Sequence, residues 1–194
     1  MPSKTKKHSS SRFKAVLLSG LPGSGKSTAV RELSLLLGWP LFSIGDLFRK
    51  QWREQYPNAE VSLEEYMKSI SLKEHKAMDL RARKVFEKGH IVGDMHHGAG
   101  ITEGLPGVLR IFISAPLQIR AERAQHTGRF TGKSTRQIMK LLDDREQVIL
   151  AVAKKIYGTS YSFSDPSRYH LVLNSGLLTI KEKITLLMSF FPKD

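Results

Sequence analysis

The sequence predicts an open, doubly wound α/β domain whose functional site lies at the carboxyl edge of a parallel sheet. Three observations lead to this fold. Short β-like runs alternate with helical patterns along the 194 residues. Most of these runs are aliphatic on both faces, which is typical of strands covered by helices on both sides. The segment GLPGSGKST at residues 20–28 joins the first such run to a helical pattern.

The elements follow from these patterns in chain order. Five apolar runs predict strands, at residues 15–19, 41–43, 90–94, 109–114 and 169–174. Helical patterns lie between them, at 27–37, 45–55, 62–89 in two or three pieces, 117–125 and 134–157, and a last helix begins near residue 179. Gly38, Gly89 and Gly158 each follow a helical pattern, where a left-handed cap is expected.

Composition predicts one domain and a leader. With 40% hydrophobic residues the chain can bury one core, so we expect a single domain over residues 14–194. Residues 1–13 form a basic, serine-rich leader that contributes to the net charge of +13 and is expected to be disordered. A solvated tail, a weak nucleic-acid contact and a transit peptide are the alternatives for this leader.

Membrane proteins, secreted proteins and thiol enzymes are excluded, because the sequence lacks the segments and residues that these classes need. No run approaches the roughly 20 apolar residues that cross a bilayer, and the leader has no apolar core of the secretory type. The absence of cysteine excludes disulfides and thiolate chemistry. We therefore expect a soluble, cytoplasmic monomer without a membrane partner.

The segment GLPGSGKST is the strongest signal in the sequence. Gly20, Gly25, Lys26 and Ser27 match the phosphate-loop pattern G-x-x-x-x-G-K-[ST] in its required context, after a strand and before a helix. Small residues let successive backbone N–H groups point inward, and the helix adds its positive N-terminal end. The predicted ATP-binding residues of this loop are Gly20, Pro22, Gly23, Ser24, Gly25, Lys26, Ser27 and Thr28.

Two residues of the loop have predicted chemical roles. Lys26 should reach the β- and γ-phosphates, and the Ser27 hydroxyl should ligate Mg²⁺. Thr28 either adds a hydroxyl near the α-phosphate or is an ordinary first-turn residue. The chain has no N-K-x-D guanine motif and is too short for the larger ATPases, so a small kinase is the class that remains.

Other segments resemble one kinase family in order and spacing. They are SIGDLFR at 43–49, VSLEEYM at 61–67, LRIFISAPLQIRAER at 109–123, KKIYG and YHLVLNSG. Together they resemble the cytidylate kinase-like family, most closely its short archaeal-type members, over about residues 14–180. The resemblance implies a three-layer P-loop NTPase fold, sheet order 2-3-1-4-5, an acceptor-binding segment at about 43–89 and a lid at about 120–145. It also implies Mg²⁺-dependent phosphoryl transfer from ATP to a nucleoside monophosphate, with CMP or dCMP the first candidates.

The resemblance places the acceptor on specific residues. Ser43, Asp46 and Arg49 match the family segment that lines the monophosphate site, with Arg49 gripping the phosphate through its planar fork. Asp46 alternatively caps the following helix, and Arg49 is alternatively a solvated surface charge. Asp79 and Arg81 resemble a family D-x-R step near the base and phosphate, or are solvated helix residues.

The resemblance also supplies the expected catalytic charges. Asp94 ends the third apolar run, where the family carries an acid that faces the phosphates and can hold a magnesium-bound water. Arg120, expected at ATP, and Arg123, expected to be catalytic, lie three apart on a helix that enters the lid, and catalytic Arg129 lies near its tip. Mobile cations over the transferring group are the expected catalytic device of such a kinase. All three arginines are alternatively surface charges.

Two positions depart from the family pattern. The chain reads Asp94-Met95-His96 where the family typically has Glu-Gly-Arg, so a mostly neutral imidazole replaces a permanent cation. Val152 stands where the family usually has another arginine, while Arg145 is kept as an acceptor contact. Either the acceptor is not CMP, or other cations substitute for the missing ones, the candidates being Lys154, Arg136 and Arg168.

His96 is expected at the acceptor site, where its protonation below pH about 6.5 would strengthen acceptor binding. A zinc site at His96 and His97 lacks a further ligand set. Trp39, Trp52 and Phe86 are expected in the core, as is Phe48 unless it lines a base pocket. Two other functions stay open: a small-metabolite kinase of the shikimate or gluconate type, and an ATP-binding regulatory or RNA-binding protein.

Overall fold

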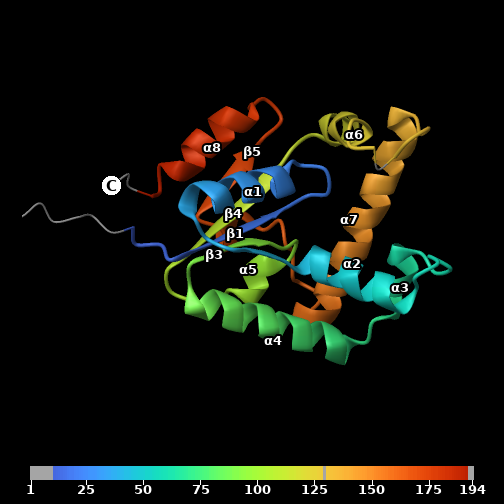
Figure 1. Cartoon of the computed structure of the whole chain (residues 1–194), viewed down its shortest axis with the longest axis horizontal. Coiled ribbons are helices and arrows are strands. Elements are labelled where there is room, and N and C mark those ends of the chain that lie inside the picture. The colour runs from blue at the N-terminus through green and yellow to red at the C-terminus, as the bar shows by residue number, and fades with distance from the viewer. Residues whose placement is uncertain (1–10, 129, 192–194) are drawn as a thin grey trace, which may run out of the picture.

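The computed structural model describes residues 11–128 and 130–191, which form one three-layer α/β domain (Figure 1). The strands are β1 (Ala15–Gly20), β2 (Leu41–Ser43), β3 (Ile91–Asp94), β4 (Val108–Ser114) and β5 (Leu171–Asn174). The helices are α1 (Lys26–Leu37), α2 (Ile44–Gln55), α3 (Leu63–Ser69), α4 (Leu72–Lys88), α5 (Gly98–Ile101), α6 (Leu117–Gln125), α7 (Thr135–Tyr157) and α8 (Ile180–Met188).

The five strands form one parallel sheet in the order β2-β3-β1-β4-β5. This confirms both the fold class and the sheet order expected from the sequence. The order reverses at β1, which pairs with β3 on one side and β4 on the other. Such a switch point opens a crevice at the carboxyl ends of the strands, and the phosphate loop begins there at Gly20.

Two apolar layers hold the helices against the sheet. On one face α1 and α8 lie side by side, and Val16, Leu18 and Leu187 are fully buried in that layer. On the other face Leu17 and Phe86 anchor the layer that includes α4. Alternate residues of β1 thus enter opposite layers, which explains why the run AVLLSG is apolar throughout. The long helix α7 packs on α6 at one end and on α4 at the other.

The element boundaries follow from capping chemistry. Ser62, Ser71, Ser134 and Thr179 each close a reciprocal capping box with an acid or glutamine three residues on, which begins α3, α4, α7 and α8. The expected region 62–89 therefore forms two helices, and the break falls at Ile70 and Ser71. The short helix α5 and a 3₁₀ turn at Pro166–Arg168 were not predicted from the sequence.

Of the three glycines expected to be left-handed caps, only Gly38 has that conformation. Gly89 and Gly158 also have positive φ, but their ψ values are extended, −172° and 159°, so the chain leaves the helix directly toward the next segment. The prediction was wrong for these two because capping also depends on where the chain must go next.

The expected leader boundary at residue 13 also needs correction. Phe13 is buried in the α1 and α8 layer, and the Ser11 hydroxyl donates to the carbonyl of Phe190. The domain therefore begins by residue 11, while residues 1–10 of the expected leader lie outside the described residues. Within the described part of the chain, no helix is long and apolar enough to span a membrane.

Candidate active site

The phosphate loop is fixed by close backbone packing. A Cβ on Gly20 would lie 2.2 Å from the Ile113 carbonyl oxygen, so β1 and β4 approach too closely there for any side chain. Gly25 caps α1 in the left-handed conformation, at φ 85°. The first N–H groups of α1 have no intrahelical carbonyl to bond, so they are free to bind an anion at this helix end.

Lys26, Ser27 and Asp94 form a compact polar cluster at the start of α1. The Lys26 ammonium lies 3.0 Å from Asp94 Oδ1, and the Ser27 hydroxyl donates to Asp94 Oδ2 over 2.8 Å. Both charged side chains are sheltered, with 7% of Lys26 and 14% of Asp94 exposed. Burial raises the pKa of Asp94, but the Lys26 charge and the hydrogen bonds from Lys26 and Ser27 oppose this effect, and the pKa lies below its usual value. The structure thus brings three predicted residues together.

The donor set at Ser27 and Asp94 suits Mg²⁺. A hydroxyl and a carboxylate are hard oxygen ligands, and Mg²⁺ usually takes one or two such groups, with water and phosphate oxygens completing its shell. The 2.8 Å contact between Ser27 and Asp94 shows that both groups reach one point beside the loop. These two residues are the ones that would hold the ion.

The side chain of His96 packs against the phosphate loop and does not lie on an open surface. Its Nδ1 lies 2.9 Å from the Gly20 carbonyl oxygen, so that nitrogen carries the proton. Burial and the positive charges of Lys26 and Arg145 lower its pKa well below 6.5, although Asp94 opposes them. The expected protonation near pH 6.5 therefore needs correction, because the ring stays neutral there. Arg145 acts on this ring from α7 through its charge.

Arg120 and Arg123, expected as lid cations, are both held by protein groups. Arg120 is buried; it donates to the Pro22 carbonyl over 3.1 Å and pairs with Glu146 at 3.2 Å. Arg123 donates to the carbonyl and the hydroxyl of Ser175, over 2.7 and 3.1 Å. Arg120 thus ties the phosphate loop to α7, and Arg123 ties α6 to the turn after β5. Arg129, expected at the lid tip, lies outside the described residues.

Ser175 is a residue of the site that sequence reasoning missed. It is fully buried directly after β5, and its hydroxyl donates to the Ser24 carbonyl over 2.9 Å. The Ser24 hydroxyl is itself buried and has no partner among the described residues, while Gly23 and Thr28 are exposed. The position of Ser175 at the carboxyl end of a parallel strand was the available signal, because such ends line the crevice.

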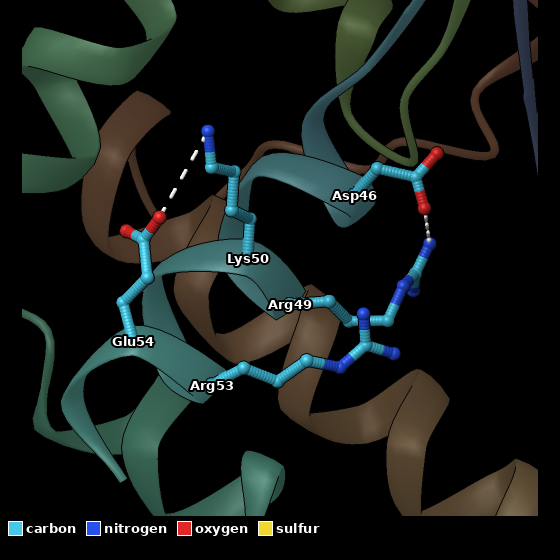
Figure 2. Close-up of a pocket in the computed structure, with 5 residues that line it drawn as sticks. All are labelled: Asp46, Arg49, Lys50, Arg53 and Glu54. Atoms are coloured by element: carbon cyan, nitrogen blue, oxygen red, sulfur yellow. Dashed lines mark hydrogen bonds and ion pairs between the residues drawn. The ribbon is translucent and has the colours of Figure 1, made fainter. Parts of the chain in front are cut away.

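A second group of charges lies along α2, where the sequence predicts the acceptor-binding segment. Asp46, Arg49, Lys50, Arg53 and Glu54 line a cavity of about 530 Å³ along α2 (Figure 2). Arg49 pairs with Asp46, and Lys50 lies 3.8 Å from Glu54. Figure 2 shows Arg49 and Arg53 extending to the same side of α2, while Lys50 turns to Glu54. Lys50 and Arg53 were not singled out in the sequence, although Arg53 follows Arg49 at the spacing of one helical turn.

The alternative role of Asp46 as the cap of α2 is wrong. Ser43 is the N-cap of α2, and its hydroxyl accepts the Asp46 N–H over 3.2 Å, which leaves the Asp46 carboxylate for Arg49. Phe48 points away from any base pocket, because it is buried in the core layer with Phe86.

Asp79 is partly buried, 13% exposed, and lies in a polar network rather than in solvent. It accepts the Tyr157 hydroxyl over 2.6 Å and lies 3.5 Å from His97 Nε2, which joins α4 to α7 and to the segment before α5. Burial and the Asp79 charge raise the pKa of Tyr157, so its hydroxyl keeps its proton. Arg81, two residues on, is exposed.

The remaining candidates are dispersed. Arg168 pairs with Glu103 at 3.1 Å, and Lys154 and Arg136 are exposed on α7. Trp39 and Trp52 pack against the two core layers, as expected. Within residues 11–128 and 130–191, no three histidine or acidic side chains are close enough to hold a metal ion together.

Comparisons with known proteins agree with this geometry. A family model described as an AAA domain matches residues 19–140. A cytidylate kinase from Ignicoccus hospitalis is 33% identical over 167 residues, which covers 84% of this chain and 90% of that protein. Among solved structures, a gluconokinase from Sinorhizobium meliloti has a TM-score of 0.58 at 15% identity, covering 92% of both chains. A shikimate kinase from Bacteroides thetaiotaomicron has a TM-score of 0.53 at 12% identity, covering 90% of this chain and 96% of that one. The two structures share the fold alone.

Proposed function

The chain belongs to the cytidylate kinase-like family of P-loop kinases, and from this premise we propose that it transfers the γ-phosphoryl group of ATP to a nucleoside monophosphate, CMP or dCMP first. It is a phosphotransferase by family, so the proposal concerns the acceptor and the residues that serve it. The relative from Ignicoccus hospitalis supports a cytidylate acceptor, at an identity where the substrate of one family member can differ from that of another.

The charged cavity along α2 is the observation that carries the proposal. Arg49 and Arg53 extend to one side of the helix, and a guanidinium pair one turn apart matches a phosphate dianion, which each planar fork can grip through two N–H groups. The cavity of about 530 Å³ has room for a mononucleotide. Arg53 thereby offers the second cation that His96 and Val152 do not supply, and we assign it that role in place of Lys154, Arg136 or Arg168.

The donor half needs few residues, because phosphoryl transfer is mostly a matter of positioning and charge. Lys26 is held by Asp94 at 3.0 Å, so its ammonium is oriented before ATP arrives and follows the migrating charge. Neutral His96 fixes the Gly20 carbonyl, which keeps the loop in shape. Arg145, on α7, adds positive charge that is felt at the His96 ring. When Mg²⁺ is bound at Ser27 and Asp94, it neutralises charge on the phosphates.

A panel of acceptors tests the proposal. ADP release from ATP with Mg²⁺ should be fastest with CMP or dCMP, slower with UMP, AMP and GMP, and at background with shikimate and gluconate. A double variant, Arg49→Gln with Arg53→Gln, should lose the nucleotide acceptor while it still binds ADP. Turnover of shikimate or gluconate in place of every nucleotide would show that the cavity along α2 serves a small metabolite, and would overturn the acceptor assignment.

A further inference from the structure

Two buried lysines flank the phosphate loop, and they differ in their partners. Lys26 is 7% exposed and pairs with Asp94 at 3.0 Å. Lys183, on α8, is 3% exposed. Among the described residues, no carboxylate lies within ion-pair distance of Lys183, and no carbonyl or side chain accepts a hydrogen bond from its ammonium. Charges on largely buried side chains are normally paired, and the Lys183 ammonium has only a small contact with solvent in place of a partner, so this lysine requires an explanation.

Local structure turns Lys183 inward and turns the neighbouring acid away. Thr179 caps α8, and Glu182 closes the capping box by accepting the Thr179 N–H and hydroxyl, both over 2.8 Å. Lys183 and Leu187 lie four residues apart on the buried face of the helix, which packs on α1 (Figure 1). The acid adjacent in sequence is therefore occupied by the cap and does not neutralise the lysine.

The Lys183 ammonium lies against Gly25 of the phosphate loop. A Cβ on Gly25 would meet Lys183 Nζ at 3.2 Å. Gly25 immediately precedes Lys26 and caps α1, so the ammonium lies beside the helix end that attracts anions. Arg123 adds a second positive charge nearby, and burial together with this charge lowers the pKa of Lys183. Two cations beside a loop shaped for anions leave a local excess of positive charge, which a polyphosphate would neutralise.

We propose that Lys183 is a second phosphate-binding lysine, which contacts the polyphosphate of the bound ATP beside Gly25. The loop pattern contains one lysine, and this second one reaches the same site from α8, more than 150 residues later in the chain. The inference rests on ATP as the donor and is independent of which acceptor the enzyme uses. An ammonium with three N–H donors suits phosphate oxygens, and the binding of one would pair the buried charge.

Packing alone gives a different expectation. The aliphatic stem of a lysine can fill space between two helices while its ammonium reaches water at the edge. In that case Lys183→Met would keep the packing and leave nucleotide binding unchanged. If the lysine binds phosphate, the same substitution removes an unpaired buried charge from the free protein and a charge-assisted contact from the complex. The two roles therefore differ in ligand affinity and in the stability of the free protein.

Calorimetric binding of ADP, of a non-hydrolysable ATP analogue and of inorganic tripolyphosphate tests this on the full chain. Lys183→Met should weaken all three about tenfold or more, while the unliganded melting temperature stays equal or rises. Lys181→Met on the same helix is the matched control, since Lys181 is exposed, and it should bind like the native protein.

Native binding of all three ligands by Lys183→Met would overturn the proposal, as would a loss confined to ADP and the ATP analogue with tripolyphosphate unaffected, because the lysine would then face the base or ribose. A lower melting temperature with unchanged ligand affinity would also overturn it. If the native protein itself fails to bind ADP, the proposed kinase function fails first, so the two failures are distinguishable.

Discussion

The two halves of the proposed site, the phosphate loop for the donor and the charged side of α2 for the acceptor, are built in opposite ways. The phosphate loop is held in place by backbone packing and by a sheltered ion pair: Gly20 packs on Ile113, and Lys26 pairs with Asp94. Along α2 the charges stand on one exposed helix, where Arg49 is 27% and Asp46 61% exposed, and they pair with each other. The first arrangement is rigid before its ligand binds, whereas the second must exchange the Asp46 pair for an acceptor. Donor binding should therefore be robust to surface changes, and acceptor choice should be adjustable by single substitutions.

The largest expected effect breaks the donor half. Lys26→Met should lower kcat by about 100- to 1000-fold, because it removes the cation that follows the migrating phosphoryl charge. Steady-state ADP release measures it, with Lys88→Met, an exposed lysine, as the control.

Loss of Lys26 also leaves Asp94 buried without its partner, which can unfold the variant. The double variant Lys26→Met with Asp94→Asn removes both charges and keeps the test valid when the single variant fails to fold. Near-native turnover in either folded variant would contradict the role of Lys26.

A smaller effect is expected in the acceptor half. Arg49→Gln should raise the acceptor KM by about 10- to 100-fold and leave the ATP KM unchanged, because a charge-assisted contact to the acceptor phosphate is lost. Part of that rise comes from Asp46, whose carboxylate then faces the acceptor unpaired. Adding Asp46→Asn should therefore recover part of the loss.

Arg31→Gln is the matched control for this pair, since Arg31 is exposed on α1, away from the α2 cavity. A change in the ATP KM with the acceptor KM constant would move Arg49 to the donor half.

The smallest expected effect is a change in the pH dependence of folding stability, which arises from His96 beside the phosphate loop. Its pKa is held below 6.5 by burial and by the Lys26 and Arg145 charges, so the unfolded chain binds a proton at this ring more readily than the folded chain does. Stability should consequently fall as pH decreases below about 6.5, with a slope from this ring of at most about 1.4 kcal/mol per pH unit. Above pH about 6.5 the ring is neutral in both states and contributes no slope.

Urea unfolding at pH 7.5, 6.5 and 5.5 measures this slope. Burial also lowers the pKa of His75 and of His170, so the native curve must be compared with that of His96→Asn, whose amide can still donate to the Gly20 carbonyl. The variant should lose less stability than the native protein over this range. Parallel curves for the two proteins would show that His96 does not titrate between the folded and unfolded states.

The sequence by itself determined the parallel sheet and the phosphate loop. The order of the strands followed from its resemblance to a known family. Runs such as AVLLSG are apolar on both faces, and GLPGSGKST needs its small residues to fold around phosphate, so local chemistry and spacing carry that information. The cluster of Lys26, Ser27 and Asp94 was predictable for the same reason, since the ends of neighbouring parallel strands meet at one edge.

Only the tertiary structure decided which charged residues are partnered and which are not. Arg120 and Arg123 donate to carbonyls that lie far from them in the sequence. Asp79 is partly buried and accepts the Tyr157 hydroxyl. Lys183 reaches Gly25 from the last helix. The pKa of His96 depends in the same way on cations from α1 and α7. A charged side chain has the same identity in a sequence whether it is solvated, paired or buried alone. Its role is fixed by the burial and partners that long-range packing provides.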